Sequence, residues 1–177
     1  SIVRADAIEG AELVKLLNNS FRDLSFSFSN AFIKLSEKFN IDANTIISIA
    51  NEGYPRNKIP LASPGVGGYC LTKDPYLYSS IFPNSPHSSL SKLGRNINAN
   101  SHKIVLQYVK KFVKINGLVK NNIKILIIGM AFKGFPETND LRGSTSVQLY
   151  KDLIGLKFKT YCFDNIIEKH HLKNQGF

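Results

Sequence analysis

The 177-residue sequence has few cysteines, no long apolar run and few acidic residues, and each shortage excludes a class of protein. Its two cysteines, Cys70 and Cys162, lie far apart and form no metal-ligand pattern, so reduced thiols, a cytoplasmic location and no metal site are the expectation. No apolar run approaches the ~20 residues that span a bilayer, which excludes a membrane helix. Residues 1–6 contain no apolar segment and are not typical of a signal peptide.

The excess of lysine and arginine over aspartate and glutamate gives a formal net charge of +10. Such an excess can indicate a nucleic-acid partner. The lysines are spread along the chain, however, with only short clusters such as Lys110 and Lys111, and no known nucleic-acid-binding motif is present. We therefore expect no nucleic-acid partner, since a partly basic surface also suits a pyrophosphate-containing ligand.

The most distinctive segment, residues 63–75, reads SPGVGGYCLTKDP. Its glycines permit positive φ and close approach to the backbone. Thr72 is expected to cap a helix that carries Pro75 in its first turn, which places Cys70 just before a helix N-terminus, where the dipole favours a thiolate. A thiolate beside a carboxylate such as Asp74 suits covalent catalysis at a carbonyl. The alternative is a tight turn with an incidental buried cysteine.

The first half of the chain is predicted to be helical. Apolar residues recur every three or four positions from Leu17 to Phe39, which indicates one long amphipathic helix. Lys15 and Asn19 lie one turn apart on roughly the opposite face of that helix. A shorter helix is predicted over residues 41–51, with Asp42 as its N-cap and Gly53 as its stop, followed by an irregular segment over residues 54–68.

A short helix is expected after Asp74 and a long one over residues 89–115. Apolar residues from Leu106 to Val113 cover much of the circumference of that long helix, which favours burial against several neighbours.

The pattern changes to strand, helix, strand after residue 117. Residues 123–128 form an apolar, β-branched run typical of a buried parallel strand, and residues 158–163 are predicted to form the next one. Ser144 is expected to cap the helix between them and Gly155 to close it. This order predicts a parallel α/β sheet, and ligands of such sheets lie beyond the carboxyl ends of the strands.

Three blocks of sequence, in the same order, resemble the UDP-glucose/GDP-mannose 6-dehydrogenase family. Residues 65–74 resemble its active-site signature, residues 125–142 resemble the start of its C-terminal nucleotide-sugar domain, and residues 11–21 resemble the opening of its central helical domain. The resemblance implies a mainly α central dimerisation domain over residues 1–116, followed over residues 117–177 by the beginning of an α/β Rossmann-like, nucleotide-sugar-binding domain.

Members of the family open with a dinucleotide-binding domain, in which a strand leads into a G-x-G-x-x-G turn. The present sequence has no such opening, and the glycines of residues 63–75 lack both the spacing and the preceding strand. We therefore expect a fragment without the N-terminal NAD-binding domain, which alone does not bind NAD tightly.

The activity implied by the resemblance is an NAD-dependent, four-electron oxidation at C6 of a UDP-hexose or UDP-N-acetylhexosamine, of use in polysaccharide biosynthesis. Cys70 would form a thiohemiacetal and then a thioester, which water hydrolyses to the uronate. Lys15 would stabilise the oxyanion. Asn19 would donate a hydrogen bond to the same oxygen or hold the water, and Asp74 would act as the general base for that water.

The resemblance also implies binding roles and a homodimer formed through the central helices. The glycine backbone is expected to pack against the sugar, since glycine permits the closest approach. The expected substrate contacts are Gly65, Gly67, Gly68, Tyr69, Arg56, Asn57 and Lys133. The expected cofactor contacts are Lys73 and Arg142. The four histidines share no spacing and are expected to be ordinary surface or packing residues.

The sequence does not decide the substrate, because Lys73 resembles enzymes acting on UDP-glucose whereas Asp74 with Pro75 resembles those acting on N-acetylated UDP-hexosamines. Two other functions stay open. One is a non-catalytic helical dimerisation module, and the other is a thiol enzyme unrelated to hydride transfer. The absence of a catalytic histidine at recognisable spacing argues against a cysteine hydrolase.

Overall fold

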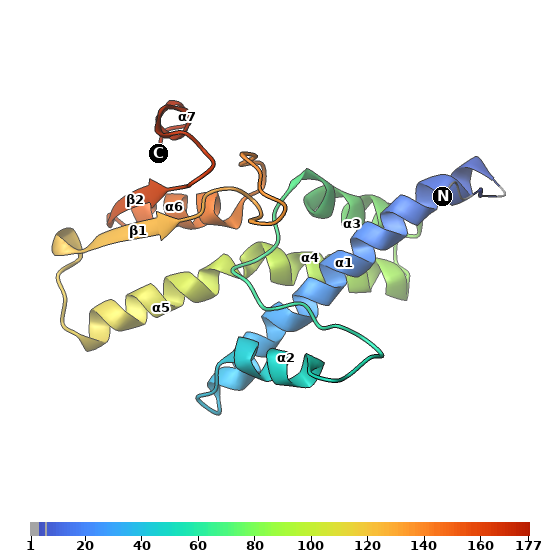
Figure 1. The fold of residues 1–177 in the computed structure, drawn as a ribbon, viewed down its shortest axis with the longest axis horizontal. Helices are drawn as coiled ribbons and strands as arrows, with labels where there is room; N and C mark the ends of the chain where they lie inside the picture. The colour runs from blue at the N-terminus through green and yellow to red at the C-terminus, as the bar shows by residue number, and fades with distance from the viewer. Residues whose placement is uncertain (1–3, 6) are drawn as a thin grey trace. The chain divides into compact units, whose positions relative to one another are not determined.

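A computed structural model of the chain describes residues 4, 5 and 7–177. The chain forms two compact units, and each is described by itself. The first unit comprises the chain up to Gly65 together with Cys70–Asn98. The second comprises Val66–Tyr69 together with Ala99–Phe177. Figure 1 shows the helices and strands of both.

The first unit is helical, as predicted, and its elements are α1 (Ile8–Glu37), α2 (Ala43–Asn51), α3 (Tyr69–Ile81) and α4 (Pro86–Asn100). The predicted cap of α2 is confirmed, because Asp42 Oδ2 accepts a hydrogen bond from the Thr45 backbone N–H at 2.7 Å. The segment over residues 54–68 contains no helix or strand, also as predicted. α1 is by far the longest element and contacts α2 near its C-terminal end (Figure 1).

α1 buries a polar face and leaves its apolar stripe exposed. The buried side chains of the helix include Ser20, Asp23 and Asn30, whereas Phe21 is 69% and Phe28 68% exposed. An amphipathic helix of a globular protein normally presents its apolar face to the core. The reversal leaves a long apolar surface uncovered in the first unit.

Several buried polar side chains of the first unit form hydrogen bonds with one another. Asp23 Oδ1 accepts hydrogen bonds from Arg95 at 2.6 Å and from Asn98 at 2.8 Å. Asn98 accepts from Asn30, which in turn accepts from the Ser63 backbone N–H. Burial raises the pKa of Asp23 and lowers that of Arg95, and the attraction between the two charges opposes both changes. The charges are therefore tolerated because they are paired.

α3 begins three residues before the predicted cap, Thr72, and this corrects the expectation for Cys70. Tyr69 is the first residue of the helix, so Cys70 lies inside its first turn and Pro75 lies further along the helix. Proline has no N–H for the carbonyl four residues earlier, which here belongs to Leu71. The Arg95 guanidinium donates to that carbonyl at 2.8 Å, which explains how the helix continues through the proline.

The second unit has the predicted strand, helix, strand order. Its elements are α5 (His102–Ile115), a 3₁₀ turn η1 (Lys120–Asn122), β1 (Lys124–Ile128), α6 (Thr145–Gly155), β2 (Lys159–Phe163) and α7 (Lys169–Asn174). β1 and β2 are parallel, with Lys124 opposite Lys159 and Ile128 opposite Phe163. Ser144 caps α6, as predicted. Gly155 lies within α6 instead of closing it, and the left-handed residue that follows the helix is Lys157, with φ of 65°.

α5 packs in the second unit, which corrects two expectations. The expected helix over residues 89–115 is divided at Ser101, and Val113 of its second part is buried with Ile127 and Leu153, while Leu106 and Val109 pack against this cluster. The second compact unit includes the chain from Ala99 onward, and α5 lies within it. The apolar breadth of α5 is largely explained by packing within the unit, so it does not by itself indicate a dimer surface.

No helix in the described ranges has the length and apolar character needed to cross a membrane.

Candidate active site

The structure brings together three of the four predicted catalytic residues, and the fourth lies one helical turn away. Lys15 and Asn19 lie one turn apart on α1, and Cys70 and Asp74 lie one turn apart on α3. The Asn19 amide donates a hydrogen bond of 2.6 Å to Asp74 Oδ2. Lys15 Nζ lies 3.8 Å from the same oxygen. We call Lys15, Asn19, Cys70 and Asp74 the cysteine cluster.

Asp74 is a buried carboxylate between two ammonium groups. Its side chain is 1% exposed, and Lys73 Nζ lies 3.8 Å from Oδ1 while Lys15 approaches Oδ2. Such a charge is costly to bury unless cations or hydrogen-bond donors compensate it. Within the described residues, Oδ1 has no hydrogen-bond partner. That oxygen can therefore accept a proton or a hydrogen bond from a ligand or a water molecule.

Cys70 is exposed and forms no disulfide. Cys70 is the second residue of α3 and so lies in its first turn, where backbone N–H groups have no partner within the helix. The positive end of the helix dipole favours negative charge at this position. An accessible thiol in such a setting is suited to act as a nucleophile.

Gly67 and Gly68 pack closely against the segment that follows β1. A Cβ on Gly67 would overlap the carbonyl oxygen of Gly143, and one on Gly68 would lie 2.7 Å from the Phe132 ring. The Gly68 N–H also donates to the Arg142 carbonyl at 3.1 Å. Close packing within the chain thus explains both glycines without a ligand, and their contact with the sugar stays a prediction. Gly65 adopts a positive φ of 129°.

Arg142, an expected cofactor contact, is already paired. Its Nε lies 3.0 Å from both carboxylate oxygens of Asp140, its NH2 group lies 2.7 Å from Oδ2, and its guanidinium lies 5.4 Å from the centre of the Tyr69 ring. Hydrogen bonds from Arg142 lower the pKa of Asp140. The pair makes Arg142 a weaker candidate for an anionic cofactor than the sequence suggested.

A cavity of about 290 Å³ lies beyond the carboxyl ends of β1 and β2, where the strand order predicts a ligand. Gly129, which follows β1, and Asp164, which follows β2, both line it. Lys133 also lines this cavity and is exposed, as expected of a residue that contacts an anionic ligand.

Asp164 was not singled out from the sequence, although its place directly after a predicted strand could have indicated it. Its carboxylate accepts hydrogen bonds from four backbone N–H groups, those of Met130, Ala131, Ile166 and Ile167. Burial alone would raise the pKa of Asp164, but the four donors outweigh it and lower the pKa. The N–H groups of Met130 and Ala131, which follow β1, are therefore occupied by this carboxylate.

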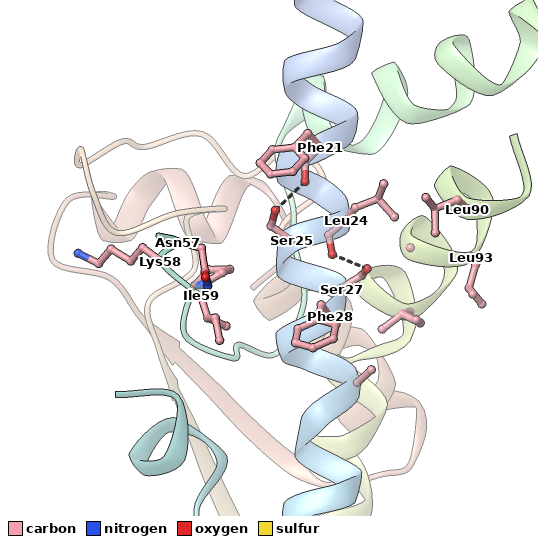
Figure 2. Close-up of a pocket in the computed structure, with 14 residues that line it drawn as sticks. Phe21, Leu24, Ser25, Ser27, Phe28, Asn57, Lys58, Ile59, Leu90 and Leu93 are labelled. Carbon is pink, nitrogen blue, oxygen red and sulfur yellow. Dashed lines mark hydrogen bonds between the residues drawn. The ribbon is translucent and has the colours of Figure 1, made fainter. Parts of the chain in front are cut away.

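The structure does not join the expected substrate contacts Arg56 and Asn57 to the cysteine cluster. Both are exposed, and in the described part of the chain no hydrogen bond or ion pair links them to Lys15, Asn19 or Asp74. Asn57 instead lines an apolar groove of about 760 Å³ along α1. Figure 2 shows this residue beside the groove, with Phe21 and Phe28 on α1.

Metal chemistry receives no support from the residues that the structure describes, which contain no group of three or more potential metal ligands. His102, expected to be an ordinary packing residue, is buried, and its Nε2 lies 3.1 Å from Asp152 Oδ2. This contact joins α5 to α6 within the second unit.

The fold of the chain is similar to that of solved nucleotide-sugar dehydrogenase structures. The model of the UDP-glucose/GDP-mannose dehydrogenase family, central domain, matches residues 9–100, and the chain belongs to this family.

Several characterised relatives share one description. UDP-N-acetyl-D-mannosamine dehydrogenase of Methanocaldococcus jannaschii is 32% identical over 154 residues, which are 87% of this chain and 34% of that protein. The enzyme of the same name from Campylobacter jejuni is 36% identical over 139 residues, 78% of this chain and 32% of that protein. A solved structure of UDP-D-ManNAc dehydrogenase from Pyrococcus horikoshii superposes on this chain with a TM-score of 0.80 at 29% identity. The superposition covers 89% of this chain and 37% of that chain.

The chain spans about a third of the length of these curated relatives. Cys70, Lys15, Asn19 and Asp74 all lie within the matched residues 9–100, whereas Lys133 and Arg142 lie beyond them.

Proposed function

We propose that this chain is part of an NAD-dependent dehydrogenase that oxidises the C6 alcohol of a UDP-N-acetylhexosamine to the uronate. The observation that carries the proposal is the Asn19–Asp74 hydrogen bond, which places an ammonium and a buried carboxylate one helical turn from an exposed thiol. The names of the relatives support both the reaction class and the N-acetylated substrate.

In the proposed reaction, the sugar loses two hydrides to two NAD⁺ and becomes a carboxylate. The first oxidation gives the C6 aldehyde, and the Cys70 sulfur then forms a bond to C6, which yields a thiohemiacetal. The second oxidation converts this adduct to a thioester. Water adds to the thioester and the C–S bond breaks, which releases the uronate and returns the thiolate.

The residues around Cys70 have separate tasks in this sequence. Lys15, an ammonium at the edge of the cluster, stabilises the negative charge that develops on the C6 oxygen. Asp74 accepts a proton from the attacking water through Oδ1, the oxygen that has no hydrogen-bond partner within the described residues. Asn19 holds the other carboxylate oxygen and so fixes the orientation of the base.

The residues present here do not provide the main dinucleotide site. The N–H groups of Met130 and Ala131, which follow the first strand, donate to Asp164. Lys73, whose side chain is 43% exposed, remains a candidate contact for a cofactor phosphate, and Arg142 is neutralised by Asp140. We propose that NAD⁺ is bound chiefly by parts of the protein outside these 177 residues.

Lys133, at the cavity beyond β1 and β2, is proposed to contact the nucleotide-sugar, since an ammonium can pair with a pyrophosphate. The alternative substrate is UDP-glucose, which the lysine at position 73 favours by resemblance. The N-acetylated sugar is preferred because the relatives named above act, by their names, on an N-acetylated hexosamine.

We also propose a homodimer, formed through the apolar surface of α1. On α1 the stripe from Leu17 to Leu35 runs along 19 residues, about 27 Å of helix, and it borders the groove that Leu90 and Leu93 of α4 also line. A linear apolar stripe can pair with its own copy around a two-fold axis, which makes a second copy of this chain the simplest occupant. Lys58 is the one charged residue among those lining the groove, so like-charge repulsion is small.

The experiment that tests the activity uses the complete protein, with UDP-N-acetyl-D-mannosamine and UDP-glucose offered in parallel with NAD⁺. We expect two NADH for each uronate and a higher kcat/KM for the N-acetylated sugar. A higher kcat/KM for UDP-glucose would reverse the substrate assignment. No oxidation of either sugar by a folded, NAD-binding protein would favour the non-catalytic module instead.

A further inference from the structure

We infer that Arg95 is a positioning residue for Cys70, because its guanidinium holds the turn of α3 on which the thiol is carried. The inference rests on the proposed function, in which Cys70 is the nucleophile. Arg95 itself is 3% exposed and cannot approach a substrate, so it acts only through the backbone.

The first observation is the carbonyl of Leu71, the residue next to Cys70. Pro75 leaves this carbonyl without its helical N–H donor, and the Leu71 residue is buried, so water does not readily replace the missing bond. Arg95 NH1 supplies the donor at 2.8 Å. The first turn of α3 therefore depends on a side chain of α4 for a bond that other helices make internally.

The second observation is what holds Arg95. The same nitrogen, NH1, contacts Asp23 Oδ1 at 2.6 Å, and Asp23 lies one turn beyond Asn19 on α1. α1 is thus linked to α3 twice, directly by Asn19 to Asp74 and through Arg95 from Asp23 to Leu71. The two links hold the turn from Cys70 to Asp74 at both of its ends. They therefore fix this turn of α3 relative to Lys15 and Asn19 on α1.

The side chain needed at position 95 is specific. A guanidinium presents several N–H donors in one rigid plane, so it can satisfy a carboxylate and a carbonyl together. Lysine would keep the charge, but its shorter side chain does not place a donor nitrogen at the position of NH1, between Asp23 and the Leu71 carbonyl. Arg95→Lys therefore tests positioning while it retains the ion-pair charge.

The test measures how fast iodoacetamide alkylates Cys70 in the 177-residue chain, by peptide mass spectrometry. Cys162, in the second unit, serves as the internal reference in the same sample. In Arg95→Lys the Cys70 rate relative to Cys162 is expected to fall about tenfold, because without the Leu71 contact the first turn of α3 frays and the thiol loses the positive end of the helix dipole, an effect that can reach roughly 30-fold. Asp23→Asn is a milder change and is expected to lower the relative Cys70 rate less. This variant replaces Arg95→Lys in the test if Arg95→Lys does not fold.

Two further variants separate positioning from stability. Asn98→Ala removes other bonds of Asp23 and Asn30 but leaves the Leu71 contact, so it should lower stability without changing the Cys70 rate more than about twofold. Pro75→Ala gives residue 75 the N–H that the Leu71 carbonyl lacks. Added to Arg95→Lys or Asp23→Asn, it should restore most of the lost rate, although it cannot restore the ion pair.

In the complete enzyme, Arg95→Lys is expected to lower kcat by roughly 10- to 100-fold and to leave KM for the sugar nearly unchanged. The inference is overturned if Asn98→Ala slows Cys70 as much as Arg95→Lys, or if Pro75→Ala restores nothing. Alkylation requires no sugar oxidation. If the complete enzyme oxidises no sugar but the variants change the Cys70 alkylation rate as expected, the proposed function is refuted and the positioning role of Arg95 is retained.

Discussion

Asn19 Nδ2 lies 2.6 Å from Asp74 Oδ2, and this hydrogen bond joins residues 55 positions apart in sequence. It commits one oxygen of a buried carboxylate to a neutral donor and leaves the other with the Lys73 ammonium at 3.8 Å but no hydrogen-bond partner in the described structure. The two oxygens of Asp74 are therefore not equivalent. Oδ2 orients the side chain, and Oδ1 is the oxygen at which a proton can be accepted.

Asp74→Asn and Cys70→Ser are expected to stop the complete enzyme at different stages. Asp74→Asn keeps the size of the side chain but removes the base, so the thioester should form and persist while turnover falls by ~10²–10⁴. Cys70→Ser should form no thioester. Intact-protein mass spectrometry after incubation with sugar and NAD⁺ should show an adduct on the first variant and none on the second.

Formation of uronate by Cys70→Ser at the wild-type rate would exclude Cys70 as the nucleophile. A matched control is Cys162→Ser, which changes a partly buried thiol whose pKa is raised by burial and should leave the reaction unaltered.

Gly67→Ala is expected to lower the free energy of unfolding by about 1–3 kcal/mol, because the added methyl group would overlap the Gly143 carbonyl. Gly155→Ala provides the control, since a Cβ there meets nothing within 4 Å and alanine favours the helix. Urea denaturation monitored by circular dichroism measures both. Equal stability of the two variants would show that the segments over residues 66–69 and 129–143 are not packed as described.

Asp164→Asn is expected to cost about 2 kcal/mol or more, since an amide group must face at least one pair of backbone donors. The pKa of Asp164 is lower in the folded chain than in the unfolded chain, so its stabilisation is complete above the ordinary value near pH 4. The stabilisation is lost as the pH falls through the folded pKa.

The difference in unfolding free energy between the natural chain and Asp164→Asn should therefore be constant above about pH 5 and shrink below pH 4. Thermal or urea denaturation over this range measures it. A difference that grows on acidification would contradict the lowered pKa.

Phe28→Glu is expected to convert a dimer of the chain to a monomer, because it places a charge on the exposed stripe of α1. Phe28 is 68% exposed, and Phe135→Glu, at a residue 92% exposed and outside any helix, is the control that should stay dimeric. Light scattering at increasing concentration distinguishes the two species. A natural chain that remains monomeric at high concentration would refute the proposed dimer.

Calorimetric titration of the 177-residue chain with NAD⁺ is expected to show no micromolar binding, because Asp164 occupies the backbone donors after β1. Asp164→Asn tests this reason further, since it frees some of those donors. Micromolar binding to the natural chain would place a dinucleotide site among the residues described.

Local sequence signals predicted those elements whose ends are set by nearby residues. Asp42 and Ser144 cap their helices through donors three positions away, and the two β-branched runs form the parallel strands. The start of α3 was predicted wrongly because its helix tolerates Pro75 through Arg95, which is distant in sequence. The buried polar face of α1 was also not predicted, since periodicity alone assigns the apolar face to the interior.

The candidate site, like the fold, was predicted in part from the sequence. The resemblance grouped Lys15, Asn19 and Asp74, and the structure places these three in contact. The roles of Asp23 and Arg95 could not be inferred from a pattern, because each is a single charged residue whose partner lies on another helix. The place of Asp164 after a predicted strand marks it as a candidate, but its partners in the turn after β1 lie more than 30 positions away in sequence and follow from no local pattern.

The assignment of Val66–Tyr69 to the second unit, between two stretches of the first, has a practical consequence for dissecting the protein. A gene divided at residue 98 does not yield two self-contained products. The N-terminal product would keep Gly67 and Gly68 but lose the Gly143 carbonyl and the Phe132 ring against which they pack, and the C-terminal product would lose the glycines. Because these four residues lead directly into Cys70, a division at residue 98 would also disturb the thiol. Co-expression of the two halves would restore the lost contacts and is therefore the better way to study a divided chain.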